Sequence, residues 1–241
     1  MKSLVHRNCL IGFWLLCATF YCGAADTEEL VSFDFQCIGL SKELRLADVY
    51  VSAGPESPRQ RVPLSDLSKS PLQRYHGTPE VVFYNKASGG TPVARIPHNP
   101  SIKSPLFIFA AAAANSNGKY SVFAIENDWS VHGSNSYVLI NMSGQVLYWM
   151  LGDKRFKLEA RNKHAVSIDA SGKKTPVVVL ESDEDGKVSR VYRAKWRNVD
   201  NMRRLVFIRD AGPNELGSVK VQVVEDCKPL ATPAEAEPRR G

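Results

Sequence analysis

The sequence predicts an all-β fold: an antiparallel β-sandwich of about a dozen strands, with two tandem sandwich halves as the alternative. Apolar and polar residues alternate with a period close to two along most of the chain, as in half-buried strands. Turn-forming residues recur at short, regular spacing, and no stretch shows a convincing helical period. The 44% apolar and 9% aromatic content is enough for a real core. Any division into halves is expected near residues 132–134.

Residues 1–25 have the pattern of a signal peptide. Two basic residues precede an apolar run over residues 9–22, and the small residues Gly23 and Ala25 occupy the two positions that a signal peptidase reads. The run of about 14 residues is shorter than the roughly 20 that span a bilayer. We therefore expect cleavage after Ala25 and a periplasmic or secreted mature chain without a membrane span. An uncleaved membrane anchor is the alternative.

Two cysteines, Cys37 and Cys227, remain after the predicted cleavage, because the other three lie within the signal peptide. In an oxidising compartment they are expected to form one disulfide that ties the ends of the folded region together. Closing so long a loop would contribute about 4 to 5 kcal/mol on the chain-entropy account. The alternative is a pair of buried thiols.

The first half begins with a lead-in over residues 26–36, which becomes a strand at residues 30–37. Prolines favour a loop at residues 54–61, and residues 63–77 are expected to be a loop with at most one helical turn. The glycines of residues 86–90 suit the turn of a hairpin. Further strands are expected at residues 44–51, 79–85 and 91–97.

Residues 105–127 are the one segment where helix and strand compete. Five alanines from Ala110 to Ala114 favour a helix by intrinsic propensity. Pro105 and the alternation of Phe107 and Phe109 favour a strand, and the sequence NSNGK after the alanines favours a turn. The prediction is a β-hairpin.

The second half reads as a series of hairpins. The run QVLYWMLG is apolar on both faces, which is typical of a strand buried between layers. The sandwich region should cover residues 37–227, and the Pro- and Ala-rich residues 228–241 should form a disordered tail. Strands are expected at residues 136–141, 145–152, 153–160, 164–169, 203–210 and 217–226, and in a long hairpin over residues 175–197.

Several motifs resemble exported bacterial β-sandwich proteins whose function is not established. They are NSYVLINMSGQVLYWMLGDKRFKLEA, PVVVLESDEDGKVSRVYRAKW and RRLVFI in the second half, and LADVYV, HGTPEVVFYN and PVARIP in the first. The resemblance covers most of residues 44–210. It implies a β-sandwich fold and export, and it carries no catalytic residue.

The strand SRVYRAKWR, residues 189–197, is the first candidate binding site. Alternation places Arg190, Tyr192, Ala194 and Trp196 on one side and Val191, Arg193, Lys195 and Arg197 on the other. With Arg203, Arg204 and Arg209 further along the chain, we expect a basic edge or face, carrying Tyr192 and Trp196, that meets an anionic polymer of the cell envelope or another envelope protein. The alternative is a solubilising face that guards an edge strand.

The loop ENDWSVHGSN is the second candidate. Asp128 supplies an acid, Trp129 an aromatic ring that could stack on a sugar, and His132 a further polar group. These types suit a secreted hydrolase acting on carbohydrate, with Asp128 and a distant carboxylate as the pair. The alternative is a connecting loop whose Trp129 covers the core. No G-x-S-x-G motif is present, so no catalytic residue is assigned.

Metal and cofactor sites are not expected. The four remaining histidines lack the short spacings that place two rings on one metal, and the acidic turn before Gly186 lacks the order of a calcium loop. The histidines are His76, His98, His132 and His164, and the acidic residues are Glu181, Asp183, Glu184 and Asp185.

The net charge falls from +6 to +4 when Lys2 and Arg7 leave with the signal peptide. So mild a charge does not indicate nucleic-acid binding. The first hypothesis is therefore an exported, non-enzymatic β-sandwich with a binding or structural role in the envelope. A secreted carbohydrate hydrolase is its rival.

Overall fold

A computed structural model describes most of the chain and is all-β, as predicted. Sixteen strands lie within the described residues, and no helix among them is long and apolar enough to cross a membrane. The predicted signal peptide and the tail from residue 229 lie outside the described residues. The described ranges are 30–40, 44–45, 47–52, 57–111, 119–168, 172–182, 185–212 and 215–228.

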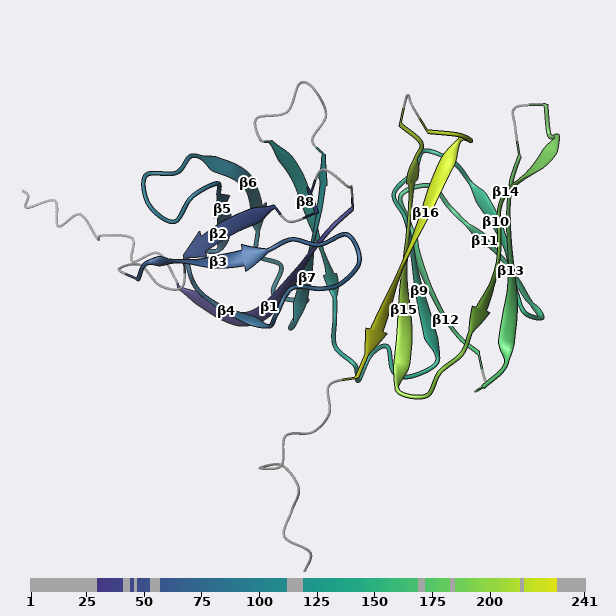
Figure 1. Cartoon of the computed structure of the whole chain (residues 1–241), viewed down its shortest axis with the longest axis horizontal. Coiled ribbons are helices and arrows are strands. Elements are labelled where there is room, and N and C mark those ends of the chain that lie inside the picture. Colours follow the sequence, from purple (N-terminus) through teal and green to yellow (C-terminus); the bar gives the residue numbers. More distant parts are fainter. Residues whose placement is uncertain are drawn as a thin grey trace, which may run out of the picture.

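The first half is a sandwich of two four-stranded sheets, with strand orders β4-β1-β7-β8 and β3-β2-β5-β6 (Figure 1). All its pairs are antiparallel except β1 with β7. Its strands are β1 (Val31–Gly39), β2 (Asp48–Ser52), β3 (Arg59–Pro63), β4 (Gln73–Gly77), β5 (Glu80–Tyr84), β6 (Pro92–Pro97), β7 (Pro105–Ala111) and β8 (Tyr120–Glu126).

The second half repeats this topology. Its sheets have the orders β12-β9-β15-β16 and β11-β10-β13-β14, which are the orders of the first half with every strand number raised by eight, and β9 with β15 is again the parallel pair. Each half is thus the same eight-stranded sandwich. The strands are β9 (Ser136–Asn141), β10 (Leu147–Leu151), β11 (Lys154–Leu158), β12 (Lys163–Ser167), β13 (Lys174–Ser182), β14 (Val188–Arg197), β15 (Met202–Asp210) and β16 (Val219–Cys227).

Each sandwich has its own core between its two sheets. Aromatic rings dominate the first core, where Phe83 and Phe109 meet edge to face at 4.9 Å. In the second core, Trp149 is 1% exposed and Trp196 stacks on Tyr137 at 5.6 Å. Such rings bury a large apolar area, which drives the association of the sheets.

A third apolar cluster joins the two halves. Phe107 of β7 faces the first core, so its neighbours Leu106 and Ile108 point the opposite way and meet the second half. Ile140 of β9 and Phe207 of β15 face them. The four sheets therefore stack as four layers, with β7, β9, β15 and the C-terminal end of β1 buried on both faces (Figure 1).

The structure contains more strands than the dozen predicted, because two edge strands lie in segments predicted as loops. β3 and β4 each have one neighbouring strand and present polar side chains such as Arg61 and Arg74 to solvent. An edge strand needs little apolar surface, so its alternation is weak. Where helix and strand competed, the chain forms strand β7 up to Ala111, and the turn predicted after it lies outside the described residues.

Candidate functional site

The contact between the halves contains a buried polar network centred on Arg203. Its Nε donates to Oδ2 of Asp226 at 2.7 Å, and its Nη2 donates to Oδ1 of Asn127 at 2.6 Å. Lys69 of the first half reaches the other oxygen of Asp226 at 2.7 Å. Asn127 in turn donates to Gln36 of β1 at 2.9 Å. These mutually satisfied groups hold one sandwich against the other.

The predicted pair Asp128 and Trp129 lies on the connection between the halves, beside this network. The carboxylate of Asp128 accepts hydrogen bonds from the hydroxyl of Ser130 at 2.6 Å and from its backbone N–H at 2.7 Å, and these lower the pKa of Asp128. The guanidinium carbon of Arg203 lies 4.4 Å from the centroid of the Trp129 ring. These contacts belong to a connecting turn, and the hydrolase hypothesis stays a prediction.

The disulfide predicted between Cys37 and Cys227 is not present. Both cysteines are free thiols. Cys37 lies on the face of β1 that points into the first core, whereas Cys227 is exposed at the end of β16 in the second half. The position of Cys37 on its strand therefore directs its sulfur away from the second half.

Among the described residues, no group of three or more His, Cys, Asp or Glu side chains could hold a metal ion. In the acidic turn, Asp183 and Glu184 lie outside the described residues, while Glu181 accepts hydrogen bonds from Ser189 and Ser218.

The basic strand is β14, the edge of the sheet β11-β10-β13-β14. Arg193 and Lys195 are exposed and lie opposite Val178 and Pro176 of β13, on the face that points away from the core. Arg197 is exposed on the same face. The three predicted cations are therefore brought together.

The two predicted aromatic residues of β14 point the other way. Trp196 is 8% exposed and belongs to the second core, and its indole N–H donates to the hydroxyl of Tyr192 at 3.4 Å. Trp196 and Tyr192 therefore do not lie on the basic face, which corrects the prediction of an aromatic-bearing basic surface on this strand. The predicted contributors Arg203, Arg204 and Arg209 do not join it either, because they lie on β15 in the other sheet of the second half.

A β-bulge changes the face of Arg190. The pairing register shifts between Val179 and Leu180, so Val179 pairs with Tyr192 while Leu180 pairs with Arg190. One residue of β14 is skipped, which moves Arg190 to the same face as Arg193. Strict alternation places Arg190 on the same side of the strand as Tyr192.

The neighbouring strands complete this face, which we call the outer basic face. Tyr148, which is 40% exposed, and Met150 lie between two cationic borders, and Lys157 pairs with the exposed Glu159 at 2.8 Å. No outward position of the four strands carries a carboxylate within the described residues. The face comprises Tyr148, Met150, Arg155, Lys157, Val178, Leu180, Arg190, Arg193, Lys195 and Arg197.

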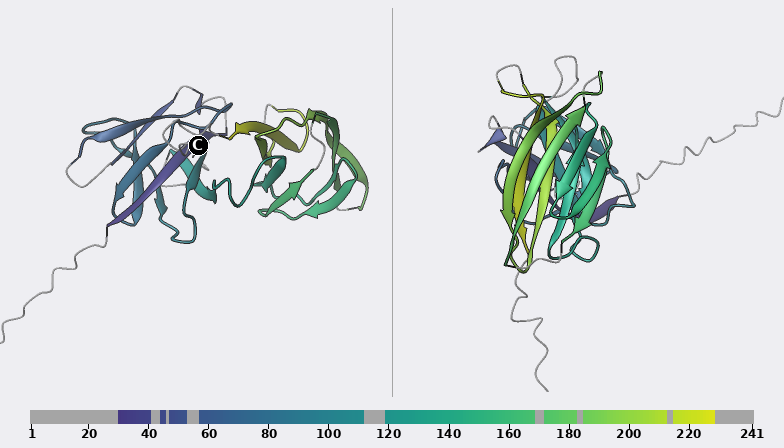
Figure 2. Two further views of the ribbon diagram at one scale, coloured as in Figure 1. Left: turned by 90° about the horizontal axis from the view of Figure 1, so that it is seen from below. Right: turned by 90° about the vertical axis from the view of Figure 1, so that its right-hand side faces the viewer.

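The outer basic face is open and broad. The green strands of its sheet lie toward the viewer in the right-hand view of Figure 2. Alternate residues along a strand lie roughly 7 Å apart, and the borders on β11 and β14, three strand spacings apart, are separated by about 14 Å. The face therefore presents two cationic rows on either side of an apolar stripe.

Comparisons with models of known protein families and with curated proteins find no match for this chain. The side chains of the outer basic face are cations and apolar groups, and none of the ten is a carboxylate, histidine, serine or cysteine. Such a set can attract and hold an anion.

Proposed function

We propose that this protein is an exported, non-enzymatic binding protein of the cell envelope, and that its outer basic face holds an anionic polymer. The observation that carries the proposal is the pair of cationic rows on one sheet face, where the four strands carry no outward carboxylate at their described positions and the nearest one, Glu159, follows the end of β11 and pairs with Lys157. Clustered charges of one sign raise the local concentration of the opposite charge.

An extended polymer suits this face better than a small anion. The cations lie in rows on an open sheet and do not converge on one point. Several weak contacts made by one chain add up through their high effective concentration. The apolar stripe, with the half-exposed ring of Tyr148, can cover the CH-bearing faces of the repeating units.

Export is supported by the composition of residues 1–25, which combine a basic start, an apolar run and small residues before Asp26. The mature protein should be recovered from the envelope fraction of the source cell with Asp26 as its first residue. Intact mass and N-terminal sequencing would establish this. A chain that keeps Met1 and stays in the cytosol would contradict the export proposal.

The binding proposal is tested by reversing the charge of β14. We expect R193E/K195E/R197E to weaken binding to a fluorescently labelled linear polyphosphate at least tenfold at about 0.1 M salt, because three attractive contacts become repulsive. The three side chains are exposed, so the variant should fold. Anisotropy titration gives the Kd, and circular dichroism checks the fold.

The matched control is K86E/K103E/K119E, which makes the same change in net charge at exposed positions of the first half. Its Kd should stay within about twofold of the wild type, because these charges lie outside the face and are screened beyond about 10 Å at 0.1 M salt. Equal weakening by both triple variants would show attraction by net charge alone. Binding to vesicles of anionic lipid but not to the polymer would also overturn the proposal.

A further inference from the structure

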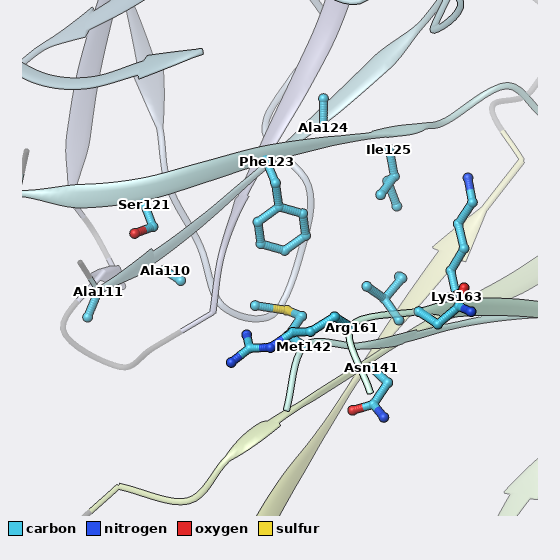
Figure 3. Close-up of a pocket in the computed structure, with 12 residues that line it drawn as sticks. Ala110, Ala111, Ser121, Phe123, Ala124, Ile125, Asn141, Met142, Arg161 and Lys163 are labelled. Atoms are coloured by element: carbon cyan, nitrogen blue, oxygen red, sulfur yellow. Dashed lines mark hydrogen bonds between the residues drawn. The ribbon is translucent and has the colours of Figure 1, made fainter. Parts of the chain in front are cut away.

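A cavity of about 700 Å³ opens between the two halves, away from the outer basic face (Figure 3). Phe123 and Ile125 of β8 form its wall on the first half, together with the small side chain of Ala110. Ile140 and Met142 form the wall on the second half. The cavity has the volume of pockets that take small organic ligands.

The charged side chains that line it, among the described residues, all lie on one wall. They are Arg161 and Lys163, in and after the β11–β12 connection, and no described carboxylate lines the cavity. In Figure 3 the side chain of Arg161 runs beside Met142 beneath the ring of Phe123, while Lys163 lies toward Ile125. The wall formed by the first half is therefore apolar. It faces a second-half wall that is apolar at its base and cationic at its rim.

Neither cation is neutralised firmly. Within the described part of the chain, no carboxylate forms an ion pair with Lys163. The guanidinium of Arg161 is 3.9 Å from Asp210, and both side chains of that pair are more than half exposed, so their attraction is weak. The backbone of Arg161 has φ 58°, a conformation that residues other than glycine seldom adopt. A tight turn thus presents Arg161 at the rim.

The shared topology of the halves shows why the cavity exists. The cavity lies beside β8 of the first half and β12 of the second half. The counterpart of each in the other half, β16 for β8 and β4 for β12, lies on the opposite side of the contact. There, the β3–β4 connection, residues 64–72, fills the space, because the carbonyl of Asp66 accepts a hydrogen bond from Gln222 at 2.6 Å and Lys69 pairs with Asp226. The corresponding β11–β12 connection spans only residues 159–162, and the space stays open.

We propose that this cavity binds an amphipathic anion, with a hydrocarbon chain against Phe123, Ile125 and Met142 and a carboxylate or phosphate head at Arg161 and Lys163. Burying the chain removes apolar surface from water. The two cations select for a negative head, because a neutral head leaves them without a new partner. The site is separate from the outer basic face and does not depend on its role.

The test uses the purified full chain and isothermal titration with three probes of equal chain length: dodecanoate, dodecyl phosphate and dodecanol. The wild type should bind at least one anion with saturation at one site and should bind dodecanol at least tenfold more weakly. The preferred anion identifies the head group, carboxylate or phosphate. Dodecanol that binds as tightly as both anions would overturn the proposal.

Variants separate the two parts of the site. R161E/K163E should weaken binding of the preferred anion at least tenfold and leave dodecanol within twofold, because it changes only the rim. A110F, which fills the apolar part, should weaken all probes that the wild type binds. The melting temperature of every variant is compared with that of the wild type. A second substitution at the same position, A110L, guards against a folding defect that is specific to A110F.

The matched control is K86E/K119E, a second pair of exposed lysines with the same change in net charge and no place in the cavity. It should leave every Kd within twofold. Equal loss of binding in this control and in R161E/K163E would overturn the proposal, as would the absence of saturable binding of either anion by the wild type up to about 1 mM.

Discussion

Arg203 and Asp226 form a 2.7 Å ion pair across strands β15 and β16, with only 1% and 5% of their side chains exposed. The pair lies within the contact between the two sandwich halves, where Lys69 of the first half also reaches Asp226. Burial disfavours isolated charges, so each of these groups depends on the others for compensation. Consistent with this, burial lowers the pKa of Lys69 although Asp226 opposes the shift.

Removing the central carboxylate should be strongly destabilising. We expect D226N to lower the free energy of unfolding by about 3 to 5 kcal/mol, because it leaves two buried cations without a counter-charge. Urea unfolding monitored by tryptophan fluorescence measures the change. The control is E80Q, which breaks the exposed Arg95–Glu80 pair and should cost at most about 1 kcal/mol. Equal effects of both substitutions would contradict a buried network.

The apolar contact between the halves should make them unfold together. Phe207 is 1% exposed in the cluster that joins them. We expect F207A to cost about 3 to 5 kcal/mol and to separate calorimetric unfolding into two transitions, because the halves lose much of their shared surface. L216A, at a side chain that is 91% exposed, should change stability by less than about 0.5 kcal/mol. A single unchanged transition in F207A would argue against this coupling.

The two cysteines should differ in reactivity. Burial raises the pKa of the Cys37 thiol, and its side chain is 0% exposed, so it should resist alkylation in the native protein. Cys227 is exposed and should react. Iodoacetamide labelling followed by peptide mass spectrometry should find the label on Cys227 natively and on both after denaturation. If neither cysteine is labelled in the native protein until a reducing agent is added, the two cysteines form a disulfide. That result would contradict the free thiols.

Glu215 should contribute to stability in a pH-dependent way. Two hydrogen bonds from Arg209, with a further one from the backbone N–H of Gly212, lower the pKa of Glu215 from 4.5 to about 2. Its contribution is therefore complete above pH 4.5 and is lost as the pH falls toward 2. The pair is one-third exposed, so we expect E215Q to cost about 1 kcal/mol at pH 7.

Urea titrations of the wild type and E215Q at pH 7, 4.5 and 2.5 measure this dependence. The difference between the two proteins should shrink at the lowest pH. A difference that stays constant at all three values would show that the charge of Glu215 is not the cause.

Polymer binding at the outer basic face should depend steeply on salt. Several exposed cations contribute to the attraction of the polymer. Added salt shortens the distance over which exposed charges attract, to about 3 Å at 1 M. The affinity of the wild type for polyphosphate should fall at least tenfold between 0.05 and 0.5 M NaCl, whereas R193E/K195E/R197E should show a smaller slope. Anisotropy titration at several salt concentrations measures both. A salt-independent Kd would exclude an electrostatic face.

Strand β14 shows how far a local pattern reaches. Alternation correctly separates Arg193, Lys195 and Arg197 from Tyr192 and Trp196, because successive side chains on a strand point to opposite faces. The pattern does not say which of the two faces is buried. The bulge that moves Arg190 is also invisible in it, because a bulge arises from pairing with β13.

The same limit applies to Cys37 and to the cavity. Two cysteines near the ends of a sandwich suggest a disulfide, yet the phase of β1 directs Cys37 into the first core. The cavity exists because the β11–β12 connection is shorter than the equivalent β3–β4 connection. The two connections begin 95 residues apart, at residues 159 and 64, and both meet the contact between the halves. Neither connection carries a motif that marks this role.

What the sequence determined by itself is local: the two-residue alternation and the turn residues specify strands, and the apolar runs on both faces indicate strands buried between layers. Only the tertiary structure decided which faces meet, that two equivalent sheets form the contact between the halves, and that a cavity remains there. The physical reason is that strand periodicity is a property of neighbouring residues, whereas burial, ion pairing and register depend on partners far away in the chain.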